Sequence, residues 1–277
     1  MLDRTIIGNA PLIIFVGPAR CGKSMVLMSL VEYLRNKLKK YVVTPNYEYI
    51  PNDDSYKSKC DQFMETLQRN AGKRDGYKDP LDGSVDEILL DVRDGKNGPV
   101  KFRMLEAPGE DFFSINNPQK PYAQYLNEII SKNRKEKYPV YYVMLLDIHT
   151  DNNKFNHPTD STRGDYESRL IEFFENGYMH SRGDKVVLLY NKIDMAINKQ
   201  EALENLLTSF YPDIRDRFKR RVLVFFNVPV YNGVQPYKTG HWEKKENDEG
   251  EKSWQYKTDA ESEAYAEKLW GTLISRL

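Results

Sequence analysis

Apolar residues form short runs along the whole chain, and these runs alternate with segments of helical spacing. Residues 140–146 are a continuous apolar run, which is typical of a strand buried on both faces of a parallel sheet, and 185–190 predicts another buried strand. In residues 24–40, Leu27, Leu30 and Leu34 lie three and four positions apart, which predicts an amphipathic helix. The predicted strands are 11–16, 85–92, 99–105, 140–146, 185–190 and 222–226. The predicted helices are 24–40, 60–70, 121–132, 166–174, 200–209, 213–218 and 260–277.

The order of these elements predicts a three-layer α/β fold with a mostly parallel sheet of about six strands. A turn signal at residues 94–98 joins two of them, so one antiparallel hairpin strand is expected. Because apolar segments are spread along the whole length, we expect one domain over residues 1–277. Two polar insertions are expected, a mobile segment outside the core at about 45–84 and a solvated connection at about 232–257.

Composition narrows the classes of partner and compartment. Among 277 residues, 41 are Lys or Arg and 41 are Asp or Glu, so no net charge draws the chain to nucleic acid or an anionic membrane. Two cysteines, Cys21 and Cys60, cannot form a disulfide framework, which favours a reducing cytoplasm. No apolar run is as long as a membrane span, and no lipidation pattern is present. We therefore expect a cytoplasmic protein without a stable membrane anchor or a nucleic-acid partner.

One motif joins the first predicted strand to the first predicted helix. It fits G-x-x-x-x-G-K-[ST] and consists of Gly17, Pro18, Ala19, Arg20, Cys21, Gly22, Lys23 and Ser24. At a helix N-terminus, free backbone N–H groups and the helix dipole favour an anion, and the two glycines let the backbone curl around phosphate oxygens. We expect Lys23 to reach the β- and γ-phosphates of a nucleotide and Ser24 to bind Mg²⁺. The motif predicts a P-loop NTPase fold.

A second motif, N-K-x-D at residues 191–194, follows a buried strand at the sheet edge where ligands of such folds bind. The carboxylate of Asp194 can accept hydrogen bonds from N1–H and the exocyclic amine of guanine, a donor pair that adenine lacks on that edge. Asn191 can tie this segment to the phosphate loop, and the stem of Lys192 can lie over the base. The alternative is that Asp194 only caps a helix.

A third motif, at residues 106–109, follows the second hairpin strand. The carboxylate of Glu106 can hold Mg²⁺ directly or through water, and the backbone N–H of Gly109 can bond the γ-phosphate. The alternative is an acidic residue at a strand end followed by a turn.

In the order of its elements and motifs, the chain resembles the Ras-like P-loop GTPases of the translation-factor-related class, and within it the divergent bacterial GTPases. This resemblance implies binding of GTP and GDP with Mg²⁺, slow hydrolysis of GTP and a nucleotide-dependent switch. It also implies a protein effector or regulator. Lys23, Ser24, Gly109, Asn191 and Asp194 match positions of the family.

Several positions depart from the family pattern. Glu106 replaces an aspartate, and Glu110 occupies the place of the glutamine that orients the attacking water. Glu110 can act there as a base or repel the γ-phosphate. Arg20 can supply a positive charge beside the phosphates or point into solvent.

Two further ligand groups are less well marked in the sequence. A backbone N–H near Asn227 or Val228 can meet guanine O6 in place of the family's usual loop. Ser84 is favoured over Thr44 as the switch residue that completes the Mg²⁺ site. Two other functions stay open: a P-loop ATPase or kinase in which 191–194 is accidental, and a GTP-binding scaffold that does not hydrolyse.

Overall fold

A computed structural model describes residues 8–17, 21–69, 87–106, 121–147, 167–168, 171, 184–193, 208, 211–219, 224–225, 228–246 and 252–274. The strands are β1 (Leu12–Val16), β2 (Tyr41–Pro45), β3 (Ile88–Asp94), β4 (Val100–Glu106), β5 (Val140–Asp147), β6 (Lys185–Asn191), β7 (Val224–Phe225), β8 (Val228–Pro236), β9 (His241–Glu246) and β10 (Lys252–Lys257). The helices are α1 (Lys23–Glu32), its π-helical continuation η1 (Tyr33–Leu38), α2 (Asp54–Arg69), α4 (Pro121–Lys135), α7 (Pro212–Lys219) and α8 (Ala260–Ile274).

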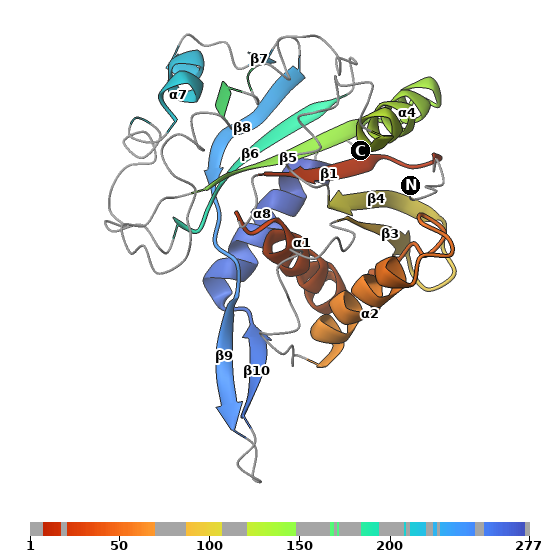
Figure 1. Cartoon of the computed structure of the whole chain (residues 1–277). Helices are drawn as coiled ribbons and strands as arrows, with labels where there is room; N and C mark the ends of the chain where they lie inside the picture. The colour runs from red at the N-terminus through yellow and green to blue at the C-terminus, as the bar shows by residue number, and fades with distance from the viewer. Residues whose placement is uncertain are drawn as a thin grey trace.

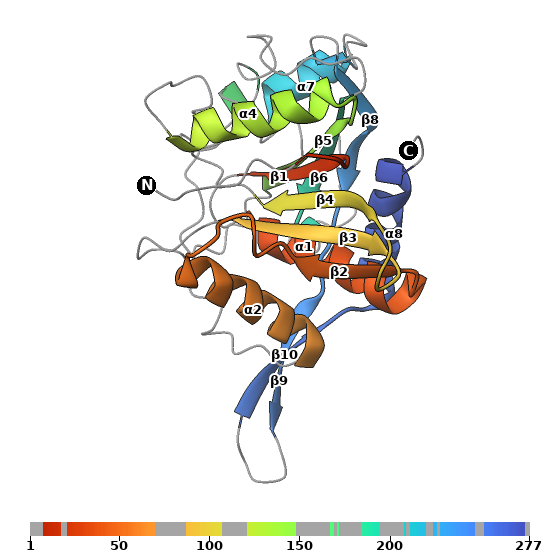
Figure 2. The same ribbon diagram turned by 90° about the vertical axis from the view of Figure 1, so that its right-hand side faces the viewer.

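The fold has three layers around one eight-stranded sheet of order β2-β3-β4-β1-β5-β6-β8-β7. Helices α1, α2 and α8 lie on one face of the sheet, and α4 and α7 lie on the other (Figures 1 and 2). Parallel pairing joins β4, β1, β5, β6 and β8. Strand β3 is antiparallel to both of its neighbours. The predicted three-layer fold, with its mostly parallel sheet and antiparallel hairpin strand, is therefore confirmed.

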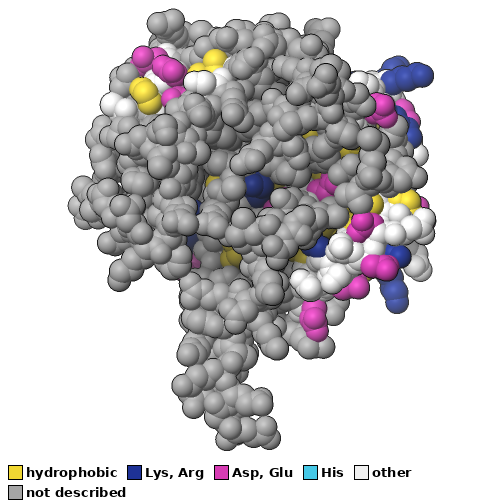
Figure 3. Space-filling model, in the orientation of Figure 1, with side chains coloured by type: hydrophobic (Ala, Val, Ile, Leu, Met, Phe, Trp, Pro, Cys, Tyr) yellow, Lys and Arg dark blue, Asp and Glu magenta, His cyan; other side chains and the backbone are white. Residues whose placement is uncertain are grey.

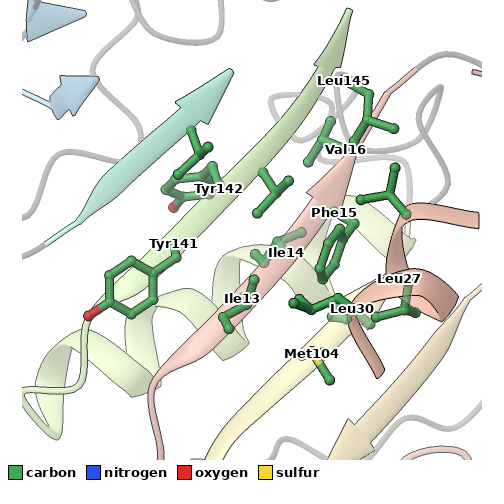
Figure 4. Close-up of a cluster of buried hydrophobic side chains, with 14 of the residues drawn as sticks. Ile13, Ile14, Phe15, Val16, Leu27, Leu30, Met104, Tyr141, Tyr142 and Leu145 are labelled. Atoms are coloured by element: carbon green, nitrogen blue, oxygen red, sulfur yellow. The ribbon is translucent and has the colours of Figure 1, made fainter. Parts of the chain in front are cut away.

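The buried core is centred on β1, whose five residues are all buried. Phe15 lies beside Leu27 and Leu30 of α1 (Figure 4), on the α1 face of the sheet. Burying a side chain of this kind contributes about 1.5–3 kcal/mol relative to leaving it exposed. This packing fixes the end of β1 relative to the start of α1, which is where the phosphate-loop motif lies.

The expectation that residues 45–84 lie outside the core is wrong for the part that the structure describes. Helix α2 begins at Asp54, six positions before the predicted start at Cys60. Tyr56, Cys60 and Phe63 are spaced along one helical face and are buried, and so is Tyr49 before the helix. Tyrosine carries a polar hydroxyl on an apolar ring, so Tyr49 and Tyr56 look like residues of a polar segment and were not predicted to be buried. Residues 70–86 lie outside the described residues.

The position of the last parallel strand also differs from the prediction. Within the segment 222–226 the structure describes Val224 and Phe225, which form the two-residue strand β7 and pair antiparallel with β8. Strand β8 pairs parallel with β6, with Val230 opposite Val186 and Pro236 opposite Tyr190. Strand β8 contains Asn232 and Gly233, which are typical of a turn. Its pairing with β6 outweighs this local preference. Strands β2 and β8, which lie outside the predicted strands, account for the difference between eight strands and about six.

The polar stretch at 232–257 is not a loop, as was expected, but holds the end of β8 and an antiparallel hairpin. In that hairpin the pairing of β9 with β10 runs from His241 opposite Lys257 to Glu246 opposite Lys252. The hairpin projects away from the sheet beside α8 (Figures 1 and 2). Its sequence is too polar to read as strands without knowledge of the pairing.

Charged side chains of both signs are mixed over α2 on the face shown in Figure 3. None of the described helices is long and apolar enough to cross a membrane. The predicted helices at 166–174 and 200–209 lie largely outside the described residues.

Candidate functional site

The phosphate-loop motif lies between the end of β1 and the start of α1. Gly22 is the N-cap residue of α1 and has a φ of 94°, a left-handed conformation that favours glycine. A Cβ atom at Gly22 would also lie 2.6 Å from Nδ2 of Asn191. The backbone conformation and this close contact therefore both disfavour a side chain at position 22. Helix α1 has no side-chain N-cap hydrogen bond and no acidic residue in its first turn. Its N-terminus is therefore suited to an anion.

The loop is closed by contacts among its own residues. The ammonium of Lys23 donates to the backbone carbonyl of Gly17 at 3.0 Å. A Cβ atom at Gly17 would lie 2.4 Å from Sγ of Cys21, which is fully buried. Cys21 thus fills the space beneath the loop as a packing residue. Pro18, Ala19 and Arg20 lie outside the described residues.

Asn191 connects the end of β6 to this loop. Its Nδ2 donates to the backbone carbonyl of Cys21 at 2.7 Å, which confirms the predicted tie between the two motifs. The side chain is 1% exposed, and its Oδ1 has no hydrogen-bond partner among the described residues. The next residue, Lys192, has a φ of 59°, which is uncommon for a residue with a side chain and often marks a functional site. Asp194 lies outside the described residues.

Ser24 and Glu106 bring two oxygen ligands together beside the loop. Parallel pairing of β1 with β4 places Glu106 opposite Phe15, at the same sheet edge as the motif. Oγ of Ser24 donates to Oε1 of Glu106 at 2.5 Å. Glu106 is 4% exposed, and its Oε2 is buried without a hydrogen-bond partner among the described residues. An unpaired buried carboxylate oxygen is costly, and a cation at this place would satisfy it.

These residues fit Mg²⁺, which prefers oxygen ligands and is usually bound by one or two protein groups together with substrate phosphates and water. Within the described ranges there is no cluster of three or more His, Cys, Asp or Glu that could hold a metal. The site therefore suits a metal ion that binds together with a phosphate ligand. Thr44 does not reach this place, because it lies on β2, separated from β4 by β3 and so about 10 Å away across the strands.

The segment beside Asn191 is not the one expected from the sequence. Val228 is the first residue of β8, at the opposite sheet edge and about 26 Å along the strand from Pro236, so its predicted contact with the base is wrong. Asn227 lies outside the described residues. The segment that adjoins the N-K-x-D motif is 237–240, which we name the base loop. Tyr237 N–H donates to Tyr190 O at 2.9 Å, and Ile193 N–H donates to Tyr237 O at 3.2 Å.

The base loop was not predicted, because the last parallel strand ends at Pro236, ten positions after its predicted end at residue 226. The signal that could have found it is Pro236, which is followed by the turn-forming Thr239 and Gly240. Ser84, Gly109 and Glu110 also lie outside the described residues, and their roles stay predictions.

No protein-family model matches the chain, and no curated protein matches its sequence. Among solved structures, the GTPase-like domain of Ski7 from S. cerevisiae, bound to GDP and inorganic phosphate, has a TM-score of 0.40 and 15% identity over 83% of this chain and 43% of that chain. The signal recognition particle receptor SRb-GTP/SRX complex from Chaetomium thermophilum has a TM-score of 0.40 and 13% identity over 84% and 92%. The septin GTPase domain from Chlamydomonas reinhardtii has a TM-score of 0.38 and 12% identity over 96% and 91%.

The chain thus spans less than half the length of the Ski7 structure that it matches. At these scores and identities the likeness carries no argument about activity.

Proposed function

We propose that this chain is an Mg²⁺-dependent GTP hydrolase of the Ras-like P-loop class that acts as a nucleotide-dependent switch. The observation that carries this proposal is the hydrogen bond from Asn191 to the carbonyl of Cys21. It joins a phosphate-binding motif to an N-K-x-D motif, so one ligand with both phosphates and a guanine base can span the two.

The phosphates bind at the N-terminus of α1. Backbone N–H groups of the loop donate to phosphate oxygens, and the helix dipole favours their negative charge. The ammonium of Lys23, held by Gly17 O at 3.0 Å, exchanges this neutral partner for phosphate oxygens when nucleotide binds. Charge-assisted hydrogen bonds are stronger than neutral ones, so the exchange is favourable.

The base binds between the N-K-x-D motif and the base loop. Asp194 accepts from N1–H and the exocyclic amine of guanine, and the stem of Lys192 covers the face of the base. A backbone N–H of the base loop donates to O6, a role first expected of Asn227 or Val228. The buried hydrogen bonds that hold Asn191 and Tyr237 preorganise both walls before the ligand arrives.

Ser24 and Glu106 would hold Mg²⁺, with Ser84 as the proposed switch ligand. Held there, the metal would supply positive charge against the negative charge that develops in phosphoryl transfer. Glu106 is one methylene longer than aspartate, which brings its Oε1 to 2.5 Å from Ser24 Oγ.

Hydrolysis requires groups near the γ-phosphate, and we assign them from the sequence. Glu110 accepts a proton from the attacking water, Gly109 N–H bonds the γ-phosphate, and Arg20 supplies positive charge. Release of phosphate would free Gly109 and the adjoining segment, which is the basis of a switch read by a protein effector. A reducing cytoplasm suits a chain whose two cysteines are both free and buried.

Phosphate release from GTP, measured with and without Mg²⁺, tests the hydrolase. We expect slow release that depends on Mg²⁺ and that Glu110→Ala reduces without loss of GTP affinity. Tight GTP binding without any phosphate release would instead identify a non-hydrolysing scaffold.

A further inference from the structure

We propose that Lys238 is a positioning residue for guanine recognition, because its ion pairs with Asp259 and Glu261 hold the base loop in place and tie it to the hairpin β9–β10. This inference rests on the proposed function, and it assigns a role to residues that neither nucleotide motif includes.

One side of the base loop is fixed by Tyr237. Its backbone makes two hydrogen bonds to β6 and the segment after it, through Tyr190 O and Ile193 N–H. Its ring is 1% exposed, and its hydroxyl lies 3.5 Å from Oγ of Ser29 on α1. Tyr237 therefore fixes the start of the loop but not the residues that follow it.

The other side of the loop is fixed by Lys238. Its ammonium donates to Oδ2 of Asp259 at 2.7 Å and to Oε2 of Glu261 at 2.8 Å. The Lys238 side chain is 15% exposed, whereas the side chains of Asp259 and Glu261 are 38% and 59% exposed, so solvent screens the carboxylate side of both pairs. Two charge-assisted hydrogen bonds from one ammonium leave the loop little freedom to move away from α8.

The anchor for Lys238 is itself rigid. Oδ1 of Asp259 accepts from Ser262 N–H at 2.8 Å, and Asp259 N–H donates to Ser262 Oγ at 2.9 Å, which caps α8 reciprocally. The hydrogen bond from Lys238 holds the pKa of Asp259 at about 2, so the carboxylate is ionised throughout the physiological range. The buried side chains of Leu269 and Trp270 pack α8 against the sheet.

The same ion pair closes the root of the hairpin. Strand β9 begins at His241, three residues after Lys238, and β10 ends at Lys257, two residues before Asp259. The chain therefore leaves the base loop, forms the projecting hairpin and returns to the partner of Lys238 (Figure 1). A displacement of the hairpin root changes the position of the base loop, and the reverse also holds.

The test compares Lys238→Ala with Lys238→Arg and with the double variant Asp259→Asn/Glu261→Gln. The double variant removes both charges but keeps an N-cap acceptor at position 259. Lys37→Ala is the matched control, because Lys37 forms an ion pair with Glu263 on the same helix at 2.9 Å but does not contact the base loop.

Calorimetry with GDP and with inorganic tripolyphosphate, both in Mg²⁺, separates base recognition from phosphate binding. We expect Lys238→Ala and the double variant to lose about tenfold in GDP affinity and to keep their tripolyphosphate affinity. Lys238→Arg should restore most of the GDP affinity, and Lys37→Ala should resemble the wild type. An equal loss for both ligands, or no loss for GDP, would overturn the positioning role.

Amide hydrogen exchange in the absence of nucleotide provides a readout that does not depend on the proposed function. Exchange in 237–240 and at the root of the hairpin should be faster in Lys238→Ala than in Lys37→Ala. Equal exchange in the two variants would refute the positioning role even if the wild type binds GDP. If exchange is faster in Lys238→Ala than in Lys37→Ala but the wild type binds no guanine nucleotide, the proposed function is overturned and the positioning of the loop by Lys238 stands.

Discussion

Asn191 and Cys21 are 170 positions apart in the sequence, yet the amide of one donates to the backbone carbonyl of the other at 2.7 Å. The bond is buried and crosses from the end of β6 to the loop after β1, with β5 between these strands in the sheet. Because both of its ends lie at buried positions of the sheet and the adjoining loop, this bond fixes the distance between the phosphate loop and the N-K-x-D motif. Preorganisation of this kind reduces the ordering cost of binding.

This contact makes Gly22 sensitive to substitution. We expect Gly22→Ala to lower the free energy of unfolding by at least about 2 kcal/mol, because the new Cβ strains a left-handed residue and displaces Asn191. Gly95→Ala is the matched control: Gly95 has a φ of 73° but a Cβ there would meet nothing within 4 Å. Urea denaturation of both variants measures the difference. Equal losses would mean that the contact with Asn191 adds nothing to the backbone strain.

The carboxylate of Glu106 should set the dependence of nucleotide binding on Mg²⁺. Glu106→Gln keeps the shape of the side chain but removes its charge, so the Mg²⁺ concentration for half-maximal tightening of GTP binding should rise about tenfold or more. Glu48→Gln, at an exposed position before α2, is the control and should leave that concentration unchanged. Titration of Mg²⁺ against a fluorescent GTP analogue gives the value. A Glu106→Gln variant with wild-type Mg²⁺ dependence would remove Glu106 from the metal site.

Asp194 should select the base. Asp194→Asn should weaken GTP binding by about 10²-fold, because the amide keeps one acceptor oxygen and turns a donor NH₂ group toward the second guanine donor. The same variant should gain affinity for xanthosine triphosphate, whose edge is complementary to an amide. Competition binding with both nucleotides measures the exchange of preference. Asp213→Asn, on the exposed side of α7, should change neither affinity.

Local signals were sufficient for the elements that surround the phosphates. The runs at 140–146 and 186–190 are apolar throughout, and β5 and β6 match the predicted strands 140–146 and 185–190 within one residue at each end. The glycines and lysine of the loop motif constrain its backbone so closely that the strand–loop–helix arrangement follows from the motif.

Elements that depend on pairing or on amphipathic residues could not be predicted in the same way. Strand β8 contains Pro229, Asn232 and Gly233, which each disfavour a strand, and it forms because β6 offers it a parallel partner. Tyr49 and Tyr56 look like residues of a polar segment but are fully buried, with ring centroids 5.6 Å apart. The position of the base loop follows from where β8 ends, and β8 depends on its pairing with β6. The base loop therefore could not be placed from local sequence signals.

The most direct test of the central claim is calorimetric titration of the wild-type protein with GTP and with ATP in Mg²⁺. The arrangement of Asn191, the N-K-x-D motif and the base loop predicts that GTP binds about 10²-fold more tightly than ATP or better. Equal affinity for the two nucleotides would contradict guanine recognition and favour an ATPase or kinase in which residues 191–194 have no role in the base site.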